Sequence, residues 1–279
     1  MQGNLYYWKM KSNYPTIALV VTTFNSSKAL KCMLESILRQ EVFPDEIVIA
    51  DDGSTDDSIK LIDTFGGGKF NGIVKHIWQE NKGYRRSKIL NKAILASQSD
   101  YIITIDNDVI LHPKFIADHK KNARKGYFVA GRRSYITEDF AVKIKEGKAT
   151  RLPGFFSGNL KRRFSSLRIP LLSCLFYGHH RNSTRQLMGS NMAFWKSDFI
   201  SVNGFEEEFI GWGSEDREFC LRMMNCGVRR RTLVFSAIQF HLDHPVRSVH
   251  DNLQANRQIF LKAKSSKKVR ANTGIDQYE

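Results

Sequence analysis

Short apolar runs alternate with amphipathic stretches over the first third of the chain. The runs at residues 17–23, 46–50 and 101–105 are rich in β-branched residues and have no polar face. Between the first two runs, apolar side chains recur at helical spacing at Leu30, Met33, Leu34, Ile37 and Leu38. Strands without a polar face are buried on both sides, and strands separated by helices form parallel sheets. The sequence therefore predicts an α/β fold with a mostly parallel central sheet flanked by helices.

The alternation continues beyond residue 50. Ser54 is placed as the N-cap of a helix that carries Asp56 and Asp57 in its first turn and extends through Phe65. A third strand is predicted at residues 73–78 and a further helix at residues 86–96.

Two carboxylates, Asp106 and Asp108, follow the strand at residues 101–105. The carboxyl ends of parallel strands meet at one edge of the sheet, so Thr23 and Asp51 should lie near this pair. Carboxylate oxygens suit Mn²⁺ or Mg²⁺. An ordinary turn is the alternative, because Asp and Asn are favoured wherever a strand ends. A metal-assisted nucleotide site is the functional interpretation.

A second acidic motif is Gly-Trp-Gly-Ser-Glu-Asp at residues 211–216. Ser214 can cap the helix that follows, and Glu215 and Asp216 could merely complement the helix dipole, worth about 0.3–1 kcal/mol each. That interpretation leaves Trp212 between two glycines unexplained. An indole at a cleft offers a flat apolar face to a sugar ring, and a neighbouring carboxylate can accept a proton from a sugar hydroxyl.

Two histidines, His241 and His244, flank Asp243 in the segment Phe-His-Leu-Asp-His. A lone histidine is usually structural. Imidazole nitrogens can also complete the coordination of a metal bound by carboxylates. This second interpretation depends on the presence of the pair Asp106 and Asp108.

The chain is strongly basic, with 43 Lys and Arg against 28 Asp and Glu and a net charge of +15. The excess lies mainly between Glu146 and Asp198, where no acidic residue occurs, and in the tail. Nucleic acid, an acidic membrane surface and phosphorylated substrates are all compatible with such clusters. From residue 139 to 187 basic and large apolar side chains are mixed, as a membrane-surface helix requires. This segment is interpreted as an insertion or lid, or equally as a solvated loop with buried anchors.

The cysteines and the N-terminus bear on localisation. Cys32, Cys220 and Cys226 fall in predicted helices as small buried hydrophobes, so reduced thiols and a cytosolic location are expected. The first residues lack the layout of a signal peptide, and no run of about 18 apolar residues occurs. We expect a protein that is neither translocated nor membrane-spanning.

Together these motifs resemble a known family. The order and spacing of Thr22-Thr-Phe-Asn, Asp51-Asp-Gly-Ser, Asp106-Asn-Asp and Gly211-Trp-Gly-Ser-Glu-Asp are similar to those of inverting glycosyltransferases of the GT-A fold. The N-terminal half resembles family 2. From Tyr84 onward the chain is more similar to the β-1,4-galactosyltransferase type and to the galactosaminyl-transferring domain of bacterial chondroitin polymerases. The matching motifs are Tyr84-Arg-Arg-Ser-Lys-Ile-Leu-Asn91, Asn203-Gly-Phe205 with Gly211-Trp-Gly, and His241.

The resemblance implies a set of donor-binding residues. The expected nucleotide-sugar contacts are Thr23, Asn25, Asp51, Asp52, Arg86, Lys88 and Asp106. Among them, Arg86 and Lys88 would face the diphosphate. Asp108 and His241 would bind Mn²⁺ or Mg²⁺, with Asp106 contacting the ribose or the metal through water and His244 as a reserve ligand.

The resemblance also implies the catalytic groups. Asp216 would be the base, with Glu215 as the second catalytic residue, and Trp212, Gly213 and Glu215 would shape the acceptor site. One departure is Thr22, where family 2 members commonly have proline; the expected consequence is a minor loss of loop stiffness.

The implied organisation and function follow. The expected divisions are an N-terminal extension (1–14), a nucleotide-sugar-binding half (15–130), a basic and aromatic insert (131–186), an acceptor-binding and catalytic half (187–250) and a basic tail (251–279). The resemblance implies metal-dependent, inverting transfer of a hexose or N-acetylhexosamine from a UDP-sugar to a glycan or lipid-linked glycan, in bacterial surface polysaccharide or lipooligosaccharide assembly. It implies a cytoplasmic protein, peripheral on the inner face of the plasma membrane, without a nucleic-acid partner.

Two alternatives stay open. A polyanion-binding or membrane-surface module on an α/β scaffold would account for the charge, but not for the grouped acidic residues and Trp212. A nucleotidyltransferase that makes sugar nucleotides would more naturally have a glycine-rich phosphate loop after the first strand, where this chain has Thr22-Thr-Phe-Asn-Ser-Ser27.

Overall fold

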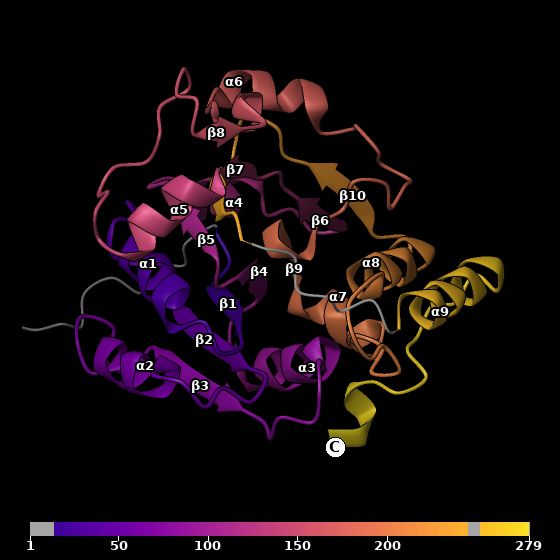
Figure 1. Cartoon of the computed structure of the whole chain (residues 1–279). Helices are drawn as coiled ribbons and strands as arrows, with labels where there is room; N and C mark the ends of the chain where they lie inside the picture. Colours follow the sequence, from indigo (N-terminus) through magenta and orange to yellow (C-terminus); the bar gives the residue numbers. More distant parts are fainter. Residues whose placement is uncertain (1–13, 245–251, 279) are drawn as a thin grey trace, which may run out of the picture.

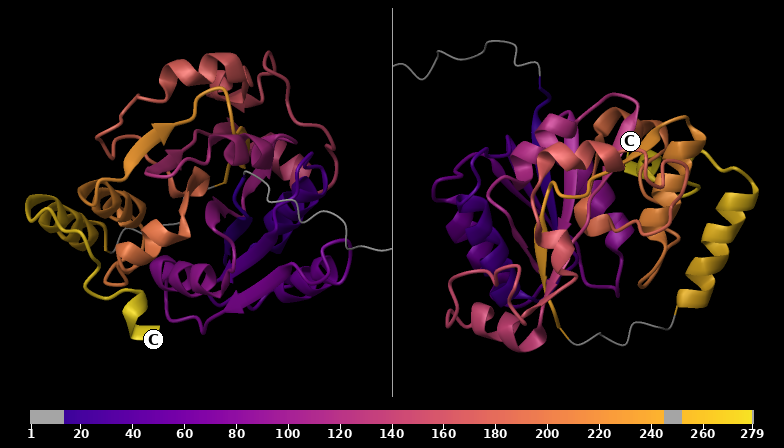
Figure 2. Two further views of the ribbon diagram at one scale, coloured as in Figure 1. Left: turned by 180° about the vertical axis from the view of Figure 1, so that it is seen from behind. Right: turned by 90° about the horizontal axis from the view of Figure 1, so that it is seen from above.

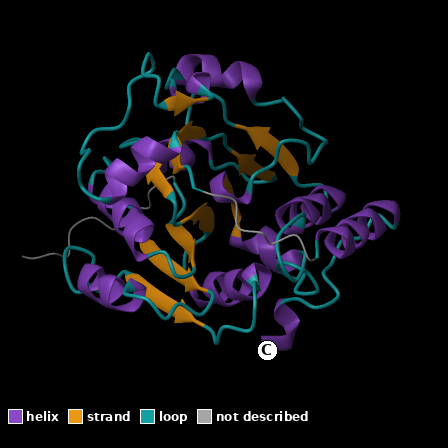
Figure 3. Ribbon diagram, in the orientation of Figure 1, coloured by secondary structure: helices purple, strands orange, loops and turns teal. Residues whose placement is uncertain are grey.

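The computed structural model describes residues 14–244 and 252–278. Almost all of the predicted N-terminal extension (1–13), the junction between the predicted catalytic half and the tail (245–251) and residue 279 lie outside the described residues. Figure 1 shows a central sheet that crosses the molecule, and Figure 3 shows helices on both of its sides. The expected α/β layering is confirmed.

The main sheet contains seven strands within the described residues: β1 (Ile17–Thr23), β2 (Glu46–Asp51), β3 (Val74–Trp78), β4 (Tyr101–Asp106), β6 (Tyr127–Ala130), β9 (Met192–Trp195) and β10 (Arg229–Thr232). Their order is β10-β6-β9-β4-β1-β2-β3. β1 pairs in parallel with β2 and β4, β2 with β3, and β6 with β10, whereas β9 runs antiparallel to β4 and β6. The prediction of a mostly parallel central sheet is confirmed.

A second, smaller sheet joins distant parts of the chain. It consists of β5 (Val109–Leu111), β7 (Ser134–Ile136), β8 (Leu160–Lys161) and β11 (Gln239–Leu242), in the order β5-β11-β7-β8. In this sheet His241 is paired with Val109 on one side and with Tyr135 on the other. The small sheet therefore places His241 beside the segment that follows β4.

Helices cover both faces of the main sheet. They are α1 (Ser27–Leu38), α2 (Ser58–Gly66), α3 (Arg86–Ala96), α4 (Phe115–Asn122), α5 (Glu138–Lys145), α6 (Pro170–Ser173), α7 (Lys196–Ser201), α8 (Glu215–Asn225) and α9 (Leu253–Ser265). Short 3₁₀ turns are η1 (Arg163–Ser166), η2 (Cys174–Phe176), η3 (Gly189–Asn191) and η4 (Ile275–Tyr278). The views of Figure 2 agree that α9 lies against α8 at one end of the molecule.

The two faces of the sheet bury separate cores. Leu19 and Val21 of β1 pack with α1, while Ala18 and Val20 pack on the opposite face with residues of α3, α7 and α8. Alternate side chains of a strand point to opposite faces, so a strand without a polar face must be covered twice. The carboxyl ends of β1 and β4 are therefore where polar groups can gather.

Helix α2 begins later than the sequence predicts. Its N-cap is Asp57, so Ser54 and Asp56 precede the helix. The Ser54 hydroxyl accepts a hydrogen bond from the backbone N–H of Asn25 at 3.0 Å, and the Ser54 N–H donates to Asp51 Oδ1 at 2.8 Å. The N-cap prediction for Ser54 is wrong because Asp51 holds the loop that leaves β2 in another conformation.

The cysteine prediction is confirmed for two helical positions and wrong for one. Cys32 and Cys220 are buried, whereas Cys226 is exposed. Cys226 is the residue that follows the last turn of α8, so it is no longer on the helix face that packs against the sheet.

The segment of residues 131–186 contributes to the fold rather than standing apart from it. It supplies β7 and β8 to the small sheet, and Ala141 of α5 is buried in a third apolar cluster. Figure 1 shows the rest of it, with α6, along the edge of the molecule farthest from α2 and α3. It is partly helical, and its role as a lid stays a prediction.

We predict that Glu218→Ala lowers the free energy of unfolding by about 3–5 kcal/mol. Both Glu218 and Arg222 are fully buried and 2.8 Å apart, and Arg222 Nη1 also donates to the carbonyl oxygens of Val202 (2.6 Å) and Gly204 (2.8 Å). The substitution leaves a buried guanidinium without its carboxylate. Urea unfolding followed by circular dichroism measures the loss.

The control is Glu146→Ala, which removes an exposed carboxylate whose partner, Lys148, lies 2.7 Å away. Its unfolding midpoint should equal that of the unaltered protein. An unchanged midpoint for Glu218→Ala would contradict the structural role of the buried pair.

Candidate active site

The carboxyl ends of β1, β2 and β4 form one edge of the main sheet. Thr23 is in register with Asp51, and Thr22 with Asp106. The predicted meeting of these strand ends is confirmed. The Thr22 hydroxyl also donates a hydrogen bond to Asp106 Oδ1 at 3.0 Å. Thr22 therefore orients the Asp106 carboxylate, a role that proline could not fill. The expectation of a minor loss of loop stiffness at Thr22 did not include this role.

Asp51 and Asp52 are both buried but differ in their partners. Asp51 Oδ2 lies 3.1 Å from His76 Nε2. Burial acts to raise the pKa of Asp51, but hydrogen bonds from His76 and Ser54 outweigh it and lower the pKa below its usual value. Asp52 accepts hydrogen bonds from the Gln79 side chain at 2.6 Å and the backbone of Arg85 at 2.7 Å. Burial nevertheless raises the pKa of Asp52.

Thr23 and Asn25 line the loop that leaves β1. The Thr23 hydroxyl accepts a hydrogen bond from Asn107 Nδ2 at 2.9 Å. Asn25 Oδ1 accepts one from the backbone of Thr55 at 2.8 Å, and Asn25 has a positive φ of 42°. Thr23 and Asp51 thus end β1 and β2, and Asn25 and Asp52 lie in the loops that follow. Ser54 and Thr55 join Asn25 to Asp51, and the Asp52 N–H donates to the Thr23 carbonyl at 3.0 Å.

Asp108, His241 and His244 form a compact cluster just beyond β4. Asp108 Oδ2 lies 3.2 Å from His241 Nε2 and 3.1 Å from His244 Nε2. Burial acts to raise the pKa of Asp108, but the hydrogen bonds with the two imidazoles outweigh it and hold the pKa well below its usual range. All three ligand atoms lie within 4.8 Å of one another.

These three residues fit a divalent cation. Ligands at about 2.1 Å from an octahedral ion and at right angles to each other lie about 3 Å apart. The two distances from Asp108 Oδ2 to the imidazole nitrogens, 3.2 and 3.1 Å, are close to this value. The second carboxylate oxygen, Asp108 Oδ1, is buried and has no hydrogen-bond partner among the described residues. A carboxylate with two imidazoles is a donor set that suits Mn²⁺ better than Ca²⁺.

Arg86 joins the two acidic motifs. Its Nη1 lies 2.7 Å from Asp216 Oδ1 and 3.9 Å from Glu215, and its Nη2 lies 3.3 Å from Asp106 Oδ1. Burial acts to lower the pKa of Arg86, but the surrounding carboxylates, Asp216 first, raise it well above its usual value. The guanidinium brings Asp106, next to the cation cluster, within one side chain of Asp216.

Glu215 and Asp216 begin α8 in different surroundings. Burial, with the neighbouring Asp216, raises the pKa of Glu215 to about 7, and its Oε2 accepts a hydrogen bond from the Gly213 N–H at 3.0 Å. A Cβ added at Gly189 would lie 1.9 Å from Asp216 Oδ2. Glycine at position 189 is therefore what leaves room for the Asp216 carboxylate.

Trp212 stands on a sharp turn at the entrance to α8. Gly211 and Gly213 have φ values of +76° and +119°, in the region that side chains other than glycine rarely adopt. The Trp212 side chain is 55% exposed. The turn thus holds a large aromatic ring out in solvent immediately before Glu215 and Asp216. Ser214 takes the N-cap position, with a φ of 73° and without a side-chain capping hydrogen bond.

Lys88 is placed differently from Arg86. Its Nζ lies 3.9 Å from Glu207 Oε2, and Glu207 also accepts hydrogen bonds from Asn91 and Tyr278. In the described part of the chain, Lys88 forms no ion pair with Asp106, Asp108 or Asp216.

Sequence reasoning missed several residues of this site. Arg133 Nη1 lies 3.9 Å from Asp106 Oδ2 and donates to the Ser190 hydroxyl at 3.2 Å. The ring of Tyr135 lies 5.2 Å from that of His241. Gly189 is the third such residue. Arg133 and Tyr135 lie in the insert region, whose irregular pattern carries no signal for them.

Comparison with known families gives two matches. Residues 18–179, more than half of the chain, match the family described as Glycosyl transferase family 2. Residues 172–245 match the one described as the N-terminal domain of galactosyltransferase.

A curated relative covers most of the chain. The chondroitin synthase of Escherichia coli is 24% identical over 265 residues, which span 87% of this chain but 37% of that protein. The chain thus spans little more than a third of the length of this relative.

Two solved structures share the fold. GalNAc-T7 with UDP, GalNAc and Mn²⁺ superposes with a TM-score of 0.65 at 15% identity, covering 95% of this chain and 53% of that one. TarS of S. aureus in complex with UDP-GlcNAc gives 0.61 at 15% identity, covering 94% and 69%. The expected GT-A fold is confirmed, and the chain belongs to glycosyl transferase family 2, with a C-terminal part of the galactosyltransferase type.

Proposed function

We propose that this protein is a metal-dependent, inverting glycosyltransferase that moves a hexose or N-acetylhexosamine from a UDP-sugar to a sugar acceptor. One observation carries the proposal: Arg86 contacts both Asp106 and Asp216, while Asp108, two residues from Asp106, contacts His241. Groups suited to a diphosphate and a group suited to proton transfer thus adjoin at the end of β4.

The comparisons support the donor class. TarS was solved with UDP-GlcNAc and GalNAc-T7 with UDP, GalNAc and Mn²⁺. On this proposal, Thr23, Asn25, Asp51 and Asp52 bind the uridine end of the donor, with Asp106 at the ribose. Mn²⁺ or Mg²⁺ held by Asp108, His241 and His244 would neutralise charge on the diphosphate.

The proposed reaction is a single in-line displacement. Asp216 accepts the proton of an acceptor hydroxyl while that oxygen forms a bond to the anomeric carbon from the face opposite the diphosphate. The bond between the anomeric carbon and the phosphate oxygen breaks, UDP leaves with the electron pair, and the configuration inverts. Arg86 orients the Asp216 carboxylate during proton transfer. Trp212, Gly213 and Glu215 border the acceptor.

We propose that both Arg86 and Lys88 contact the diphosphate, although only Lys88 would have to move to do so. Arg86 already lies at the junction between the cation cluster and Asp216. Lys88 would have to leave Glu207, a contact of 3.9 Å made by a side chain that is partly exposed.

We further propose that the protein works at the inner face of the plasma membrane, on a glycan or lipid-linked glycan in bacterial surface polysaccharide or lipooligosaccharide assembly. Basic residues are concentrated at positions 151–185 and in the tail. No helix in residues 14–244 or 252–278 has the length and apolar character needed to cross a bilayer. Association would therefore be peripheral through the described part of the chain.

Asp216→Asn is predicted to reduce sugar transfer by about 10²- to 10⁴-fold and to leave UDP-sugar binding unchanged. An amide keeps the size of the carboxylate and cannot accept the proton. Release of UDP in the presence of acceptor measures the transfer rate, and calorimetry measures donor binding.

Asp63→Asn on α2 is the matched control, because Asp63 is exposed and has no contact with the site. It should transfer at the unaltered rate, and circular dichroism should show that both variants are folded. Normal turnover by Asp216→Asn would remove Asp216 from the role of base.

Asp108→Ala is predicted to abolish the Mn²⁺-dependent part of UDP binding, since it removes the carboxylate shared by both histidines. Calorimetric titration of UDP with Mn²⁺ and with EDTA measures this difference directly. His241→Ala and His244→Ala, titrated in the same way, show which imidazole contributes more. Undiminished Mn²⁺-dependent affinity in Asp108→Ala would exclude the cluster as the metal site.

A further inference from the structure

The segment formed by α6 and η2 exposes apolar side chains beside a cavity lined by arginines. Leu171 and Leu175 are 87% and 75% exposed. Tyr177, two residues after Leu175, belongs to the wall of a cavity of about 180 Å³. The lining residues are Arg124, Tyr127, Tyr177, Gly178, Arg181 and Arg231.

The arginines of this cavity are held in place by tyrosine rings. The Arg231 guanidinium lies 3.7 Å from the ring centre of Tyr177, and those of Arg124 and Arg181 lie 5.4 and 5.9 Å from that of Tyr127. Arg181 Nη2 also donates to the Tyr127 hydroxyl at 3.1 Å. The contact with Tyr177 holds the Arg231 guanidinium against the ring face, while Arg124 and Arg181 lie within cation–π distance of Tyr127. Each guanidinium has further N–H groups that an anion can bind.

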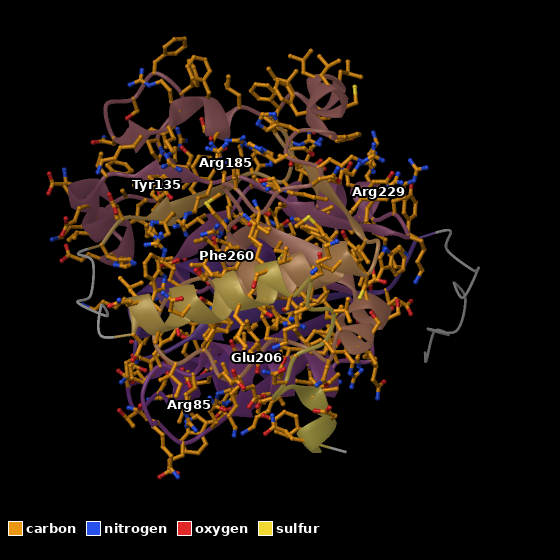
Figure 4. All side chains as sticks on the ribbon, turned by 90° about the vertical axis from the view of Figure 1, so that its right-hand side faces the viewer. Arg85, Tyr135, Arg185, Glu206, Arg229 and Phe260 are labelled. Atoms are coloured by element: carbon orange, nitrogen blue, oxygen red, sulfur yellow. The ribbon has the colours of Figure 1, made fainter. Side chains whose placement is uncertain are left out.

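The cavity carries positive charge that no carboxylate offsets. Among the described residues, none of Arg124, Arg181 and Arg231 forms an ion pair with an acidic side chain. The chain has no acidic residue between Glu146 and Asp198. Hydrogen bonds from Arg229 and Arg181 lower the pKa of Tyr127, in agreement with this local field. Figure 4 shows Arg185 and Arg229 in the same half of the molecule, above α9.

The exposed leucines favour a lipid surface over a soluble polyanion as the partner. A soluble polyanion gains nothing from apolar side chains beside its phosphate or sulfate groups. A lipid surface accommodates both, because apolar side chains enter the boundary of the acyl chains while cations meet the headgroups. Phe156 and Phe164, elsewhere in the insert, are also 89% and 69% exposed.

We propose that this surface binds a membrane, with the arginine-lined cavity holding the phosphate of an anionic lipid headgroup and Leu171 and Leu175 entering the lipid boundary. The inference rests on the peripheral association proposed above and assigns to it a headgroup and an orientation. Bidentate contacts from Arg181 and Arg231 to phosphate oxygens supply the selectivity for anionic lipid.

This headgroup cavity is distinct from the proposed donor site. Tyr127 and Arg231 belong to β6 and β10, which are parallel, and Tyr127 is at the amino end of β6. β10 is the edge strand of the main sheet, and β6 and β9 separate it from β4. The cation cluster follows the carboxyl end of β4, so two strands lie between it and the strand that carries Arg231. Changes in the cavity should therefore leave UDP binding intact.

The experiment is co-sedimentation of the full chain with phosphatidylcholine vesicles, with and without phosphatidate or phosphatidylglycerol, at low salt. The double variant R181Q/R231Q should lose affinity for anionic vesicles by about ten- to thirtyfold, as expected for two arginines at the surface. R181K/R231K keeps the charge but not the forked geometry, and it should also bind more weakly than the unaltered protein. L171S/L175S should bind more weakly to the same vesicles.

The matched control is K31Q/K60Q, which removes the same charge from exposed positions on α1 and α2 and should bind as the unaltered protein does. Failure of the unaltered protein to bind anionic vesicles would overturn the proposal, and so would unchanged binding by R181K/R231K. Cavity-dependent binding of heparin without vesicle binding would assign the cavity to a soluble polyanion instead.

Mn²⁺-dependent UDP binding, measured on the same samples, keeps the two proposals apart. It should be equal in the unaltered protein and in all four double variants. Loss of vesicle binding with intact UDP binding therefore concerns the membrane surface alone, whereas an unaltered protein that does not bind UDP contradicts the proposed transferase.

Discussion

A buried guanidinium, that of Arg86, holds the two acidic parts of the site together. An unpaired charge in this position would cost several kcal/mol, so the start of α3 requires carboxylates around it. Asp106 comes from the end of β4 and Asp216 from the start of α8, which is 110 residues later in the chain. The electrostatic requirement of one side chain thus fixes the position of a proposed base relative to a proposed nucleotide site.

Strand pairing fixes the other part of the site. The small sheet places β11 between β5 and β7, so His241 faces the chain that leaves β4 and lies 3.2 Å from Asp108. Tyr135, in register with His241, packs against its ring. The cation cluster is therefore built from backbone hydrogen bonds as well as from side-chain attraction, and its geometry is set by the fold before any ligand is bound.

The local pattern was sufficient to predict much of this arrangement. Apolar runs without a polar face predict β1, β2 and β4. Because the carboxyl ends of parallel strands meet at one edge of the sheet, the same pattern predicts that Thr23, Asp51 and Asp106 lie close together. Features that depend on tertiary packing were not predictable in this way. Ser54 is turned away from a capping role by Asp51, Gly189 is needed only because Asp216 lies against it, and Arg133 reaches Asp106 from an irregular insert. Such contacts join residues with no common periodicity.

The most direct test of the proposed donor site is anomalous diffraction from crystals grown with Mn²⁺ and UDP. We expect one manganese peak bounded by Asp108, His241 and His244, with the UDP diphosphate between that peak and Arg86 and the uracil beside Asp51 and Asp52. A manganese peak away from Asp108, or UDP bound on another face of the molecule, would contradict the central claim that these distant residues form a single donor site.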